Sequence, residues 1–231
     1  MRQIVLDTET TGLSPQQGHR IIEVGCVELI NRRLTGNNLH YYINPQRDID
    51  RAAMEVHGIT NESLEDKPVF FDIIDELLAY LKGAELVIHN APFDVGFLNQ
   101  EFKLAGPKYK LVTDHCAISD SLALARKKHP GQQNSLDVLC RRYGIDNSNR
   151  ELHGALLDAE LLAQVYLLLT GEQAQLFSVE SGNSSAGSKP EGIRRATSHR
   201  KPLPVLQPDA IERKEHKELL ALLKDMTVSE W

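Results

Sequence analysis

Short apolar runs and stretches of helical periodicity alternate along residues 1–171. Apolar runs over residues 4–6, 20–31 and 39–43 predict three strands, and their short connections favour antiparallel neighbours. A further run, residues 86–88, begins an alternation of strand and helix that is typical of the parallel half of a mixed sheet. We therefore expect an α/β domain. Apolar residues at helical spacing predict helices near residues 52–57, after Pro68, and over residues 93–104, 121–128, 135–143 and 155–169.

Beyond residue 171 the pattern changes twice. Residues 178–206 are rich in Ser, Gly, Pro and basic residues and poor in large apolar ones, which predicts a flexible linker. Residues 207–231 contain Pro208-Asp209, a favourable helix start, and then apolar residues at helical spacing. A short amphipathic helix has little core of its own, so we expect it to dock on a partner. The alternative is a helix that folds back on the main domain.

Composition narrows the class of protein. With 231 residues, 41% hydrophobic and 25% charged, the chain can hold one well-buried domain and an appendage. We expect neither a membrane span nor a secretory leader, and hence a cytoplasmic protein with its three scattered cysteines reduced. The formal net charge of −6 does not by itself favour nucleic-acid binding. A site that holds metal ions with carboxylates is nevertheless locally acidic.

The most informative stretch is the first strand and the turn after it. Asp7 and Glu9 follow the apolar run, and side chains two apart in a strand leave the sheet on the same side. Two neighbouring carboxylates repel each other, and a divalent cation relieves that repulsion. The pair alone is a weak signal, because a polar strand end in solvent explains it as well. The same pattern recurs at Asp158 and Glu160, in a helical stretch where residues two apart do not face each other.

A second acid, Asp94, follows the apolar run at residues 86–88. Pro92 suits the first helical position, which places Asp94 in the first turn of the next helix. An acid at that position stabilises a helix N-terminus without any catalytic role. Alternatively, the helix directs this carboxylate to the same sheet edge as Asp7 and Glu9. The residues themselves leave both interpretations open.

A third acid, Asp158, lies on the apolar face of its predicted helix, together with Leu161 and Leu162. An acid on an inward face is costly unless a cation meets it. His153 lies five residues earlier, so the two side chains cannot face one point from one regular helix. Gly154 suggests that His153 lies on a mobile approach to the helix. A surface histidine near a helix start is the simpler alternative.

Four carboxylates at the ends of core elements suggest a single metal site. Oxygen ligands suit Mg²⁺ or Mn²⁺ rather than Zn²⁺, and two such ions can clamp the attacking and leaving oxygens of a phosphodiester. Because an imidazole exchanges its proton near neutral pH, His153 is then the expected general base for the attacking water. The expected metal ligands are Asp7, Glu9, Asp94 and Asp158.

Three motifs resemble those of the DEDDh exonucleases: Asp-x-Glu-Thr-Thr-Gly at residues 7–12, Asn-x-x-Phe-Asp at residues 90–94 and His-x-x-x-x-Asp at residues 153–158. Each motif is weak alone, but their order and spacing are specific. Further stretches along most of residues 1–170 resemble the proofreading exonucleases of bacterial replicative polymerases. The resemblance implies a ribonuclease-H-like fold with a mixed five-stranded sheet flanked by helices. It also implies 3′→5′ removal of mismatched terminal nucleotides, with the four carboxylates holding two metals and His153 as general base.

The resemblance further implies contacts to a DNA 3′ end, either single-stranded or a frayed primer terminus. Position 52 departs from the family: relatives often have an acid there that contacts the substrate, whereas this chain has Ala52. The resemblance therefore does not imply that one contact. The residues that the resemblance places near the terminal nucleotide are Asp7, Glu9, Thr10, His57, Asn90, Phe93 and Asp158.

Residues 173–177, Gln-Ala-Gln-Leu-Phe, are similar to the peptide that docks on the bacterial sliding clamp. Leu176 and Phe177 would fill apolar pockets while Gln173 forms hydrogen bonds. The terminal segment would hold the catalytic (alpha) subunit of the polymerase and raise the effective concentration of the nuclease at the primer end. A small theta-like accessory subunit is a further candidate partner. The expected organisation is an exonuclease domain at 1–171, a clamp-binding peptide at 172–177, a linker at 178–206 and a polymerase-binding helix segment at 207–231.

Two alternatives remain open. The same motifs serve exoribonucleases and oligonucleotide-trimming enzymes, and the motifs alone cannot choose between these activities. The clamp-binding peptide and the tail favour a replication enzyme. The chain could instead be an adaptor between clamp and polymerase with a vestigial nuclease site. All five catalytic positions carry the required residues, which disfavours the adaptor.

Overall fold

The computed structural model describes residues 1–148, 150, 152–171, 210–214 and 216–217. Its residue contacts divide the chain into two compact units, Met1–Glu180 and Ser181–Trp231. In the second unit, the described residues are helical. The predicted clamp peptide, the predicted linker and most of the predicted terminal helix segment lie outside the described residues. All strands and helices discussed below belong to the first unit.

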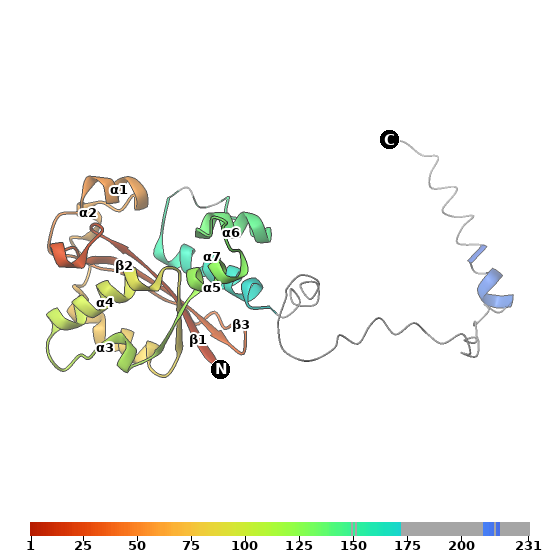
Figure 1. Ribbon diagram of the computed structural model, residues 1–231, viewed down its shortest axis with the longest axis horizontal. Coiled ribbons are helices and arrows are strands. Elements are labelled where there is room, and N and C mark those ends of the chain that lie inside the picture. The colour runs from red at the N-terminus through yellow and green to blue at the C-terminus, as the bar shows by residue number, and fades with distance from the viewer. Residues whose placement is uncertain (149, 151, 172–209, 215, 218–231) are drawn as a thin grey trace, which may run out of the picture. The chain divides into compact units, whose positions relative to one another are not determined.

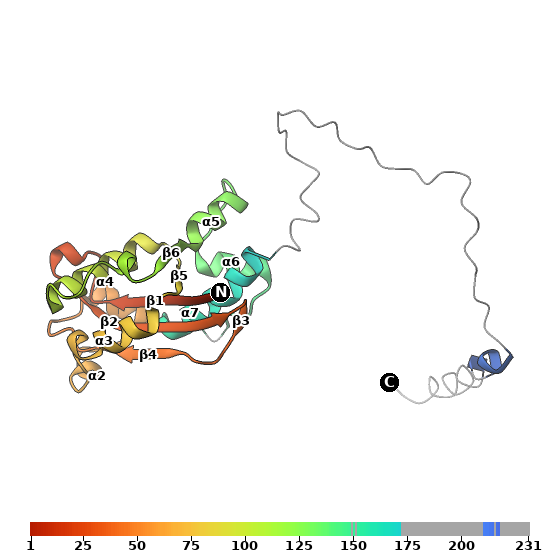
Figure 2. The same cartoon turned by 90° about the horizontal axis from the view of Figure 1, so that it is seen from below.

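A mixed sheet forms the centre of the first unit. The strand order is β3-β2-β1-β5-β6, and β4 also pairs with β2. Strand β2 runs antiparallel to β1, β3 and β4, whereas β1, β5 and β6 are parallel neighbours, which confirms the predicted mixed sheet. Figure 2 shows the strands side by side from β4 to β6. The strands are β1 (Arg2–Thr10), β2 (Ile21–Ile30), β3 (Arg33–Leu34), β4 (Leu39–Tyr42), β5 (Glu85–Ile88) and β6 (Ala117–Asp120).

The sheet has six strands in the described residues, where five were predicted. Strand β3 comprises only two residues, which is too short for a hydrophobic pattern to reveal. It pairs with Leu29 and Ile30 at the end of β2, while β4 pairs with residues 23–26 of the same strand. A ten-residue β2 is long enough to carry both partners.

The helices follow the predicted spacing closely. Two of them, α5 and α7, have the predicted bounds, whereas the four-residue α2 was not predicted. Helix α4 begins two residues earlier than predicted, because Asn90 takes a left-handed conformation (φ 70°) and the helix starts directly after it. The helices are α1 (Arg51–His57), α2 (Asn61–Leu64), α3 (Phe70–Leu81), α4 (Ala91–Ala105), α5 (Ser121–Lys128), α6 (Leu136–Tyr143) and α7 (Ala155–Leu169).

Alternate side chains of β1 pack against different helices. Ile4 and Leu6 are fully buried in the core that α3 and α4 help to form, whereas Val5 is buried in the core that α7 covers. Figure 1 shows α3 and α4 on one side of the sheet and α7 on the other. The first strand therefore faces two separate cores. None of the helices in the described ranges is both long and apolar enough to cross a membrane.

Candidate active site

The first strand directs its polar residues to both faces of the sheet. Because side chains alternate along a strand, Asp7 and Glu9 lie on the α7 side together with Val5, while Thr8 lies on the α4 side. Glu9 is buried and Asp7 is partly buried. The ladder between β1 and β2 shifts register after Glu9 and before Thr10, where the acidic stretch ends. The predicted shared face of the two acids follows from this alternation.

Asp94 is connected to β1 from the opposite face of the sheet. It lies in the first turn of α4, as predicted, and is 3% exposed. The hydroxyl of Thr8 donates a hydrogen bond of 2.7 Å to Asp94 Oδ1. The two interpretations of Asp94 are therefore compatible: the carboxylate lies at a helix N-terminus and also joins the strand that carries Asp7 and Glu9.

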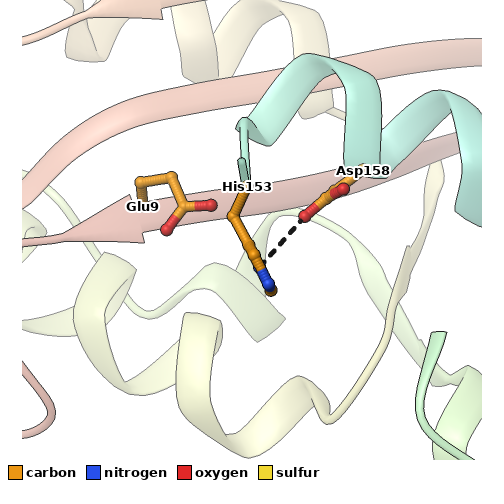
Figure 3. Close-up of side chains that lie close together, drawn as sticks. All are labelled: Glu9, His153 and Asp158. Atoms are coloured by element: carbon orange, nitrogen blue, oxygen red, sulfur yellow. Dashed lines mark ion pairs between the residues drawn. The ribbon is translucent and has the colours of Figure 1, made fainter. Parts of the chain in front are cut away.

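Asp158 and His153 come from the start of α7 (Figure 3). Asp158 is 2% exposed, whereas His153 precedes the helix and is separated from it by Gly154, whose backbone is extended. The backbone N–H of His153 donates to the carbonyl oxygen of Val56 at 3.2 Å. The side chain then reaches back, so that Nδ1 of His153 lies 3.5 Å from Oδ2 of Asp158. This position outside the helix lets both side chains face the same point.

Burial raises the pKa values of three of the acids, and repulsion by neighbouring acids adds to the rise for Asp7 and Glu9. Burial is the main cause of the rise in the pKa of Glu9 to about 8, and the charge of Asp158 adds to it. The pKa of Asp7 is raised well above its ordinary value by burial and then by Asp94 and Asp158. Burial also raises the pKa of Asp94 to about 7, although the hydrogen bond from Thr8 acts in the opposite direction. Ionising all of these groups is therefore unfavourable unless a cation lies among them.

The donor set fits a hard divalent metal ion. Among the described residues, Glu9, His153 and Asp158 each offer one ligand atom, and these three atoms lie within 4.8 Å of one another. Asp7 and Asp94 are not part of that tight group, although they line the same cleft. Carboxylate oxygens are the ligands that Mg²⁺ and Mn²⁺ prefer.

The side chain of Arg150 forms an ion pair with Asp158. Nε and Nη2 of Arg150 donate to the two carboxylate oxygens of Asp158, the second at 2.7 Å, and the arginine side chain is only 7% exposed. Nη2 also lies 2.9 Å from Nδ1 of His153, and Nη1 donates to Oδ1 of Asp137 at 2.7 Å. The sequence indicated that an inward acid needs a cation but did not identify this one. Arg150 lies outside the helices, eight positions before Asp158, so no periodic spacing relates the two residues.

The predicted catalytic side chains line one cleft of about 860 Å³. Asn90 and Phe93, predicted to lie near a substrate, line the same cleft from the start of α4. Its lining also includes Arg126, Gln132 and Asn134 from α5 and the segment after it, none of which was predicted. The five predicted catalytic residues in the lining are Asp7, Glu9, Asp94, His153 and Asp158.

Two predicted substrate residues do not line this cleft. The hydroxyl of Thr10 donates to the carbonyl oxygen of Gly12 at 2.8 Å. His57 is buried at the end of α1, where its Nδ1 accepts a hydrogen bond of 3.0 Å from the backbone N–H of Ile59. Gln173, Leu176 and Phe177 of the predicted clamp peptide lie outside the described residues.

The fold and the acidic cleft define the class of protein. Residues 4–166 match the family described as exonuclease (RNase_T). A solved structure of exonuclease X with 5′-overhanging duplex DNA is similar, with a TM-score of 0.56 and 25% identity over 74% of this chain and 93% of that one. The nuclease domain of 3′hExo, described as a DEDDh family member bound to rAMP, superposes with a TM-score of 0.60 at 21% identity over 74% and 92% of the two chains. The predicted ribonuclease-H-like fold class is confirmed.

Relatives that align over most of their own length identify the branch of this class. The DNA polymerase III subunit epsilon of Pasteurella multocida is 52% identical over 227 residues, which cover 96% of this chain and 89% of the relative. The subunit of the same name from Escherichia coli K12 is 52% identical over 198 residues, covering 84% and 82%. The chain belongs to the family of DNA polymerase III epsilon subunits.

Proposed function

We propose that this chain is a 3′→5′ exodeoxyribonuclease that proofreads DNA synthesis by removing mismatched 3′-terminal nucleotides, as a subunit of the DNA polymerase III core. The observation that carries the proposal is the convergence of four carboxylates and one histidine in one cleft. These residues come from β1, α4, α7 and the segment before α7, so a chance cluster from one element does not explain them. About half of the aligned positions are identical to those of a DNA polymerase III epsilon subunit. This identity supports a role in DNA polymerase III over the roles of other exonucleases in the family.

The acids of the cleft would hold the metal ions. Exonucleases of this family use divalent ions, and Asp7, Glu9, Asp94 and Asp158 would bind two Mg²⁺ or Mn²⁺ in this chain. When bound, such ions supply positive charge for the attacking and leaving oxygens of the phosphodiester. Thr8 keeps the carboxylate of Asp94 turned toward β1 through its hydrogen bond.

His153 would be the general base. Its side chain is 45% exposed, so water can reach the ring, while its backbone is held by the hydrogen bond to Val56. The imidazole would accept one proton from the attacking water. Asn90 and Phe93 would contact the terminal nucleotide from the wall of the cleft, with Thr10 and His57 as further contacts outside the lining described above.

The tail would connect this nuclease to its partners. Gln173, Leu176 and Phe177 would dock on the sliding clamp, and residues 207–231 would bind the polymerase catalytic subunit, with the linker at 178–206 between them. A theta-like accessory subunit is a further proposed partner. We also propose that the protein acts in the cytoplasm, where replication takes place in bacteria.

One assay tests the proposed reaction. The purified chain is given Mg²⁺ and a primer with a mismatched 3′ end, with an RNA strand in parallel and Asp7→Ala as the control. Mg²⁺-dependent loss of the mismatched nucleotide, absent in the control, is the expected result. Preference for RNA would indicate an exoribonuclease, and no cleavage of either strand would indicate an adaptor with a vestigial site.

A matched pair of primers tests how mismatches are selected. We propose that discrimination comes mainly from the cost of unpairing the terminal bases, rather than from contacts to base edges. Frayed ends should then be digested faster than paired ends of the same terminal base. Equal rates for paired and frayed ends would contradict this.

A further inference from the structure

Among the residues that the structure describes, Arg150 is the one cationic side chain that contacts both Asp158 and His153. Its guanidinium group donates hydrogen bonds to both carboxylate oxygens of Asp158, and its Nη2 lies 2.9 Å from Nδ1 of His153. A guanidinium group has five N–H donors and no acceptor, so every one of these contacts uses a lone pair of its partner. A single side chain therefore occupies acceptor atoms on two of the proposed catalytic residues.

The contact with Asp158 opposes metal binding. The oxygens that Arg150 holds as a planar fork are the atoms that would ligate a divalent ion. Two cations that use the same oxygens exclude each other, and the buried positive charge of Arg150 also repels the ion. The binding of a metal ion to Asp158 therefore weakens the pairing of Arg150 with Asp158, and this pairing weakens metal binding by the same factor.

The contact with His153 opposes proton transfer. A neutral imidazole has one donor and one acceptor nitrogen. Because Arg150 can only donate, Nδ1 of His153 is the acceptor in this contact and the ring proton lies on Nε2. Neither nitrogen is then free to accept a proton from water. The same guanidinium group thus holds both the proposed ligand and the proposed base in an unproductive arrangement.

Asp137 provides a place to which Arg150 can withdraw. Its carboxylate, in the first turn of α6, accepts a hydrogen bond of 2.7 Å from Nη1 of Arg150 and is 48% exposed, whereas the carboxylate of Asp158 is 3% exposed. Asn147 also donates to Asp137, at 3.2 Å, which keeps this acid in position. Arg150 can therefore release Asp158 and His153 while remaining paired at the rim of the cleft.

We propose that Arg150 is a displaceable counter-ion: it pairs with Asp158 and His153 until a divalent ion takes Asp158, and it then stays paired with Asp137 alone. This inference rests on the proposed function, because it assumes that Asp158 is a metal ligand. Its specific consequence is that removing Arg150 makes the ion bind more tightly. A residue that merely supported the site would have the opposite effect.

The test measures Mn²⁺ binding to the full chain by calorimetry after treatment with a chelator, with Mn²⁺ alone as the probe. Arg150→Gln should bind Mn²⁺ about tenfold more tightly than the unmodified chain. Arg150→Lys keeps the charge but not the fork, so its affinity should lie above that of the unmodified chain. In an Asp158→Asn background the Arg150→Gln change should alter the affinity much less than it does in the unmodified chain, because only the repulsion by the charge of Arg150 remains.

Arg20→Gln is the matched control. Arg20 forms a similar two-bond pair with the buried carboxylate of Glu101, at 2.8 and 2.7 Å, outside the residues that line the cleft. Its removal should lower the melting temperature by the same amount with and without Mn²⁺. Arg150→Gln should lower it more without Mn²⁺ than with Mn²⁺, so the shift in melting temperature that Mn²⁺ causes becomes larger.

The outcomes separate this inference from the proposed function. If the unmodified chain binds Mn²⁺ and Asp158→Asn weakens the binding, the metal site stands. Equal or weaker binding by Arg150→Gln would then overturn the role of Arg150, and an Arg150→Lys affinity equal to that of the unmodified chain would overturn the part played by the fork. If Asp158→Asn leaves Mn²⁺ binding unchanged, both the metal site and the inference fail.

Discussion

Gly25 of β2 lies directly against the backbone of Ala155 at the start of α7. A Cβ atom on Gly25 would lie 2.4 Å from the carbonyl oxygen of Ala155, closer than side chains approach a backbone in folded proteins. Glycine at this position allows α7 to reach the sheet. The helix start that Gly25 admits is the one that carries His153 and Asp158 toward Glu9.

Gly25→Ala should therefore displace the proposed base and one proposed ligand together. We expect a loss of about 1–3 kcal/mol in the free energy of unfolding from overpacking, and a fall in exonuclease activity beyond what partial unfolding explains. Urea unfolding and the mismatched-primer assay measure the two effects. Gly96→Ala in α4 is the control, because its Cβ would meet only the side chain of Pro15, at 4.0 Å. Full activity of Gly25→Ala would contradict the positioning role.

Thr8→Val should raise the pKa of Asp94 above about 7. Valine keeps the shape of threonine but removes the hydroxyl group that donates to the Asp94 carboxylate and lowers its pKa. A hydrogen bond to a charged group contributes about 1.5–3 kcal/mol, so the pKa should rise by at least about one unit. Carbon NMR of the metal-free chain follows this titration. The activity at pH 7 should fall about fivefold or more, because the ionised fraction of Asp94 falls from about one half to about one tenth.

Thr35→Val is the control for that substitution. Thr35 donates a hydrogen bond of 2.8 Å to the carboxylate of Glu28, which lies outside the cleft lining. Its removal should leave the titration of Asp94 and the activity unchanged. If both variants behaved alike, the effect of Thr8→Val would be general rather than local.

The metal-free chain should become less stable as pH rises toward 8. The pKa of Glu9 is raised from 4.5 to about 8 in the folded state, mainly by burial, so folding favours its protonated form. This contribution to stability is fully present below pH 4.5 and is lost as pH rises through about 8. Asp94, with its pKa raised to about 7, acts in the same direction.

Glu9→Gln should reduce that pH dependence, because glutamine stays neutral. In a chelating buffer the variant should lose less stability than the unmodified chain between pH 5 and pH 8.5, although it should be inactive with Mg²⁺. Thermal unfolding at the two pH values provides the measurement. Parallel pH profiles for the two proteins would show that Glu9 is not the source of the effect.

A chain that ends at residue 171 should fold and retain the nuclease reaction. The sheet, the helices and the cleft all lie within the first compact unit, Met1–Glu180. The shortened chain should degrade a mismatched primer in Mg²⁺ as fast as the full chain, but it should no longer bind the clamp or the polymerase catalytic subunit. Retained binding to either partner would show that the proposed tail contacts are not required.

The sequence by itself determined the elements and the faces on which the acids lie. Period-two alternation requires Asp7 and Glu9 to share a face, and helical periodicity places Asp158 among the buried residues of α7. These properties depend only on neighbours along the chain, so a local pattern is enough to predict them. The additional strand β3 was not predicted because two residues are too few to show an alternating pattern.

Only the tertiary structure decided how these faces meet. Thr8 and Asp94 are 86 positions apart, and nothing in either local pattern connects a strand hydroxyl group with an acid in the first turn of a helix. Local reasoning showed that Asp158 needs a cation, yet a metal ion and Arg150 satisfy that electrostatic requirement equally well. The choice between these two cations depends on where Arg150 lies relative to α7 in the folded chain. Such contacts arise when packed elements bring distant segments together, which periodicity along the chain does not encode.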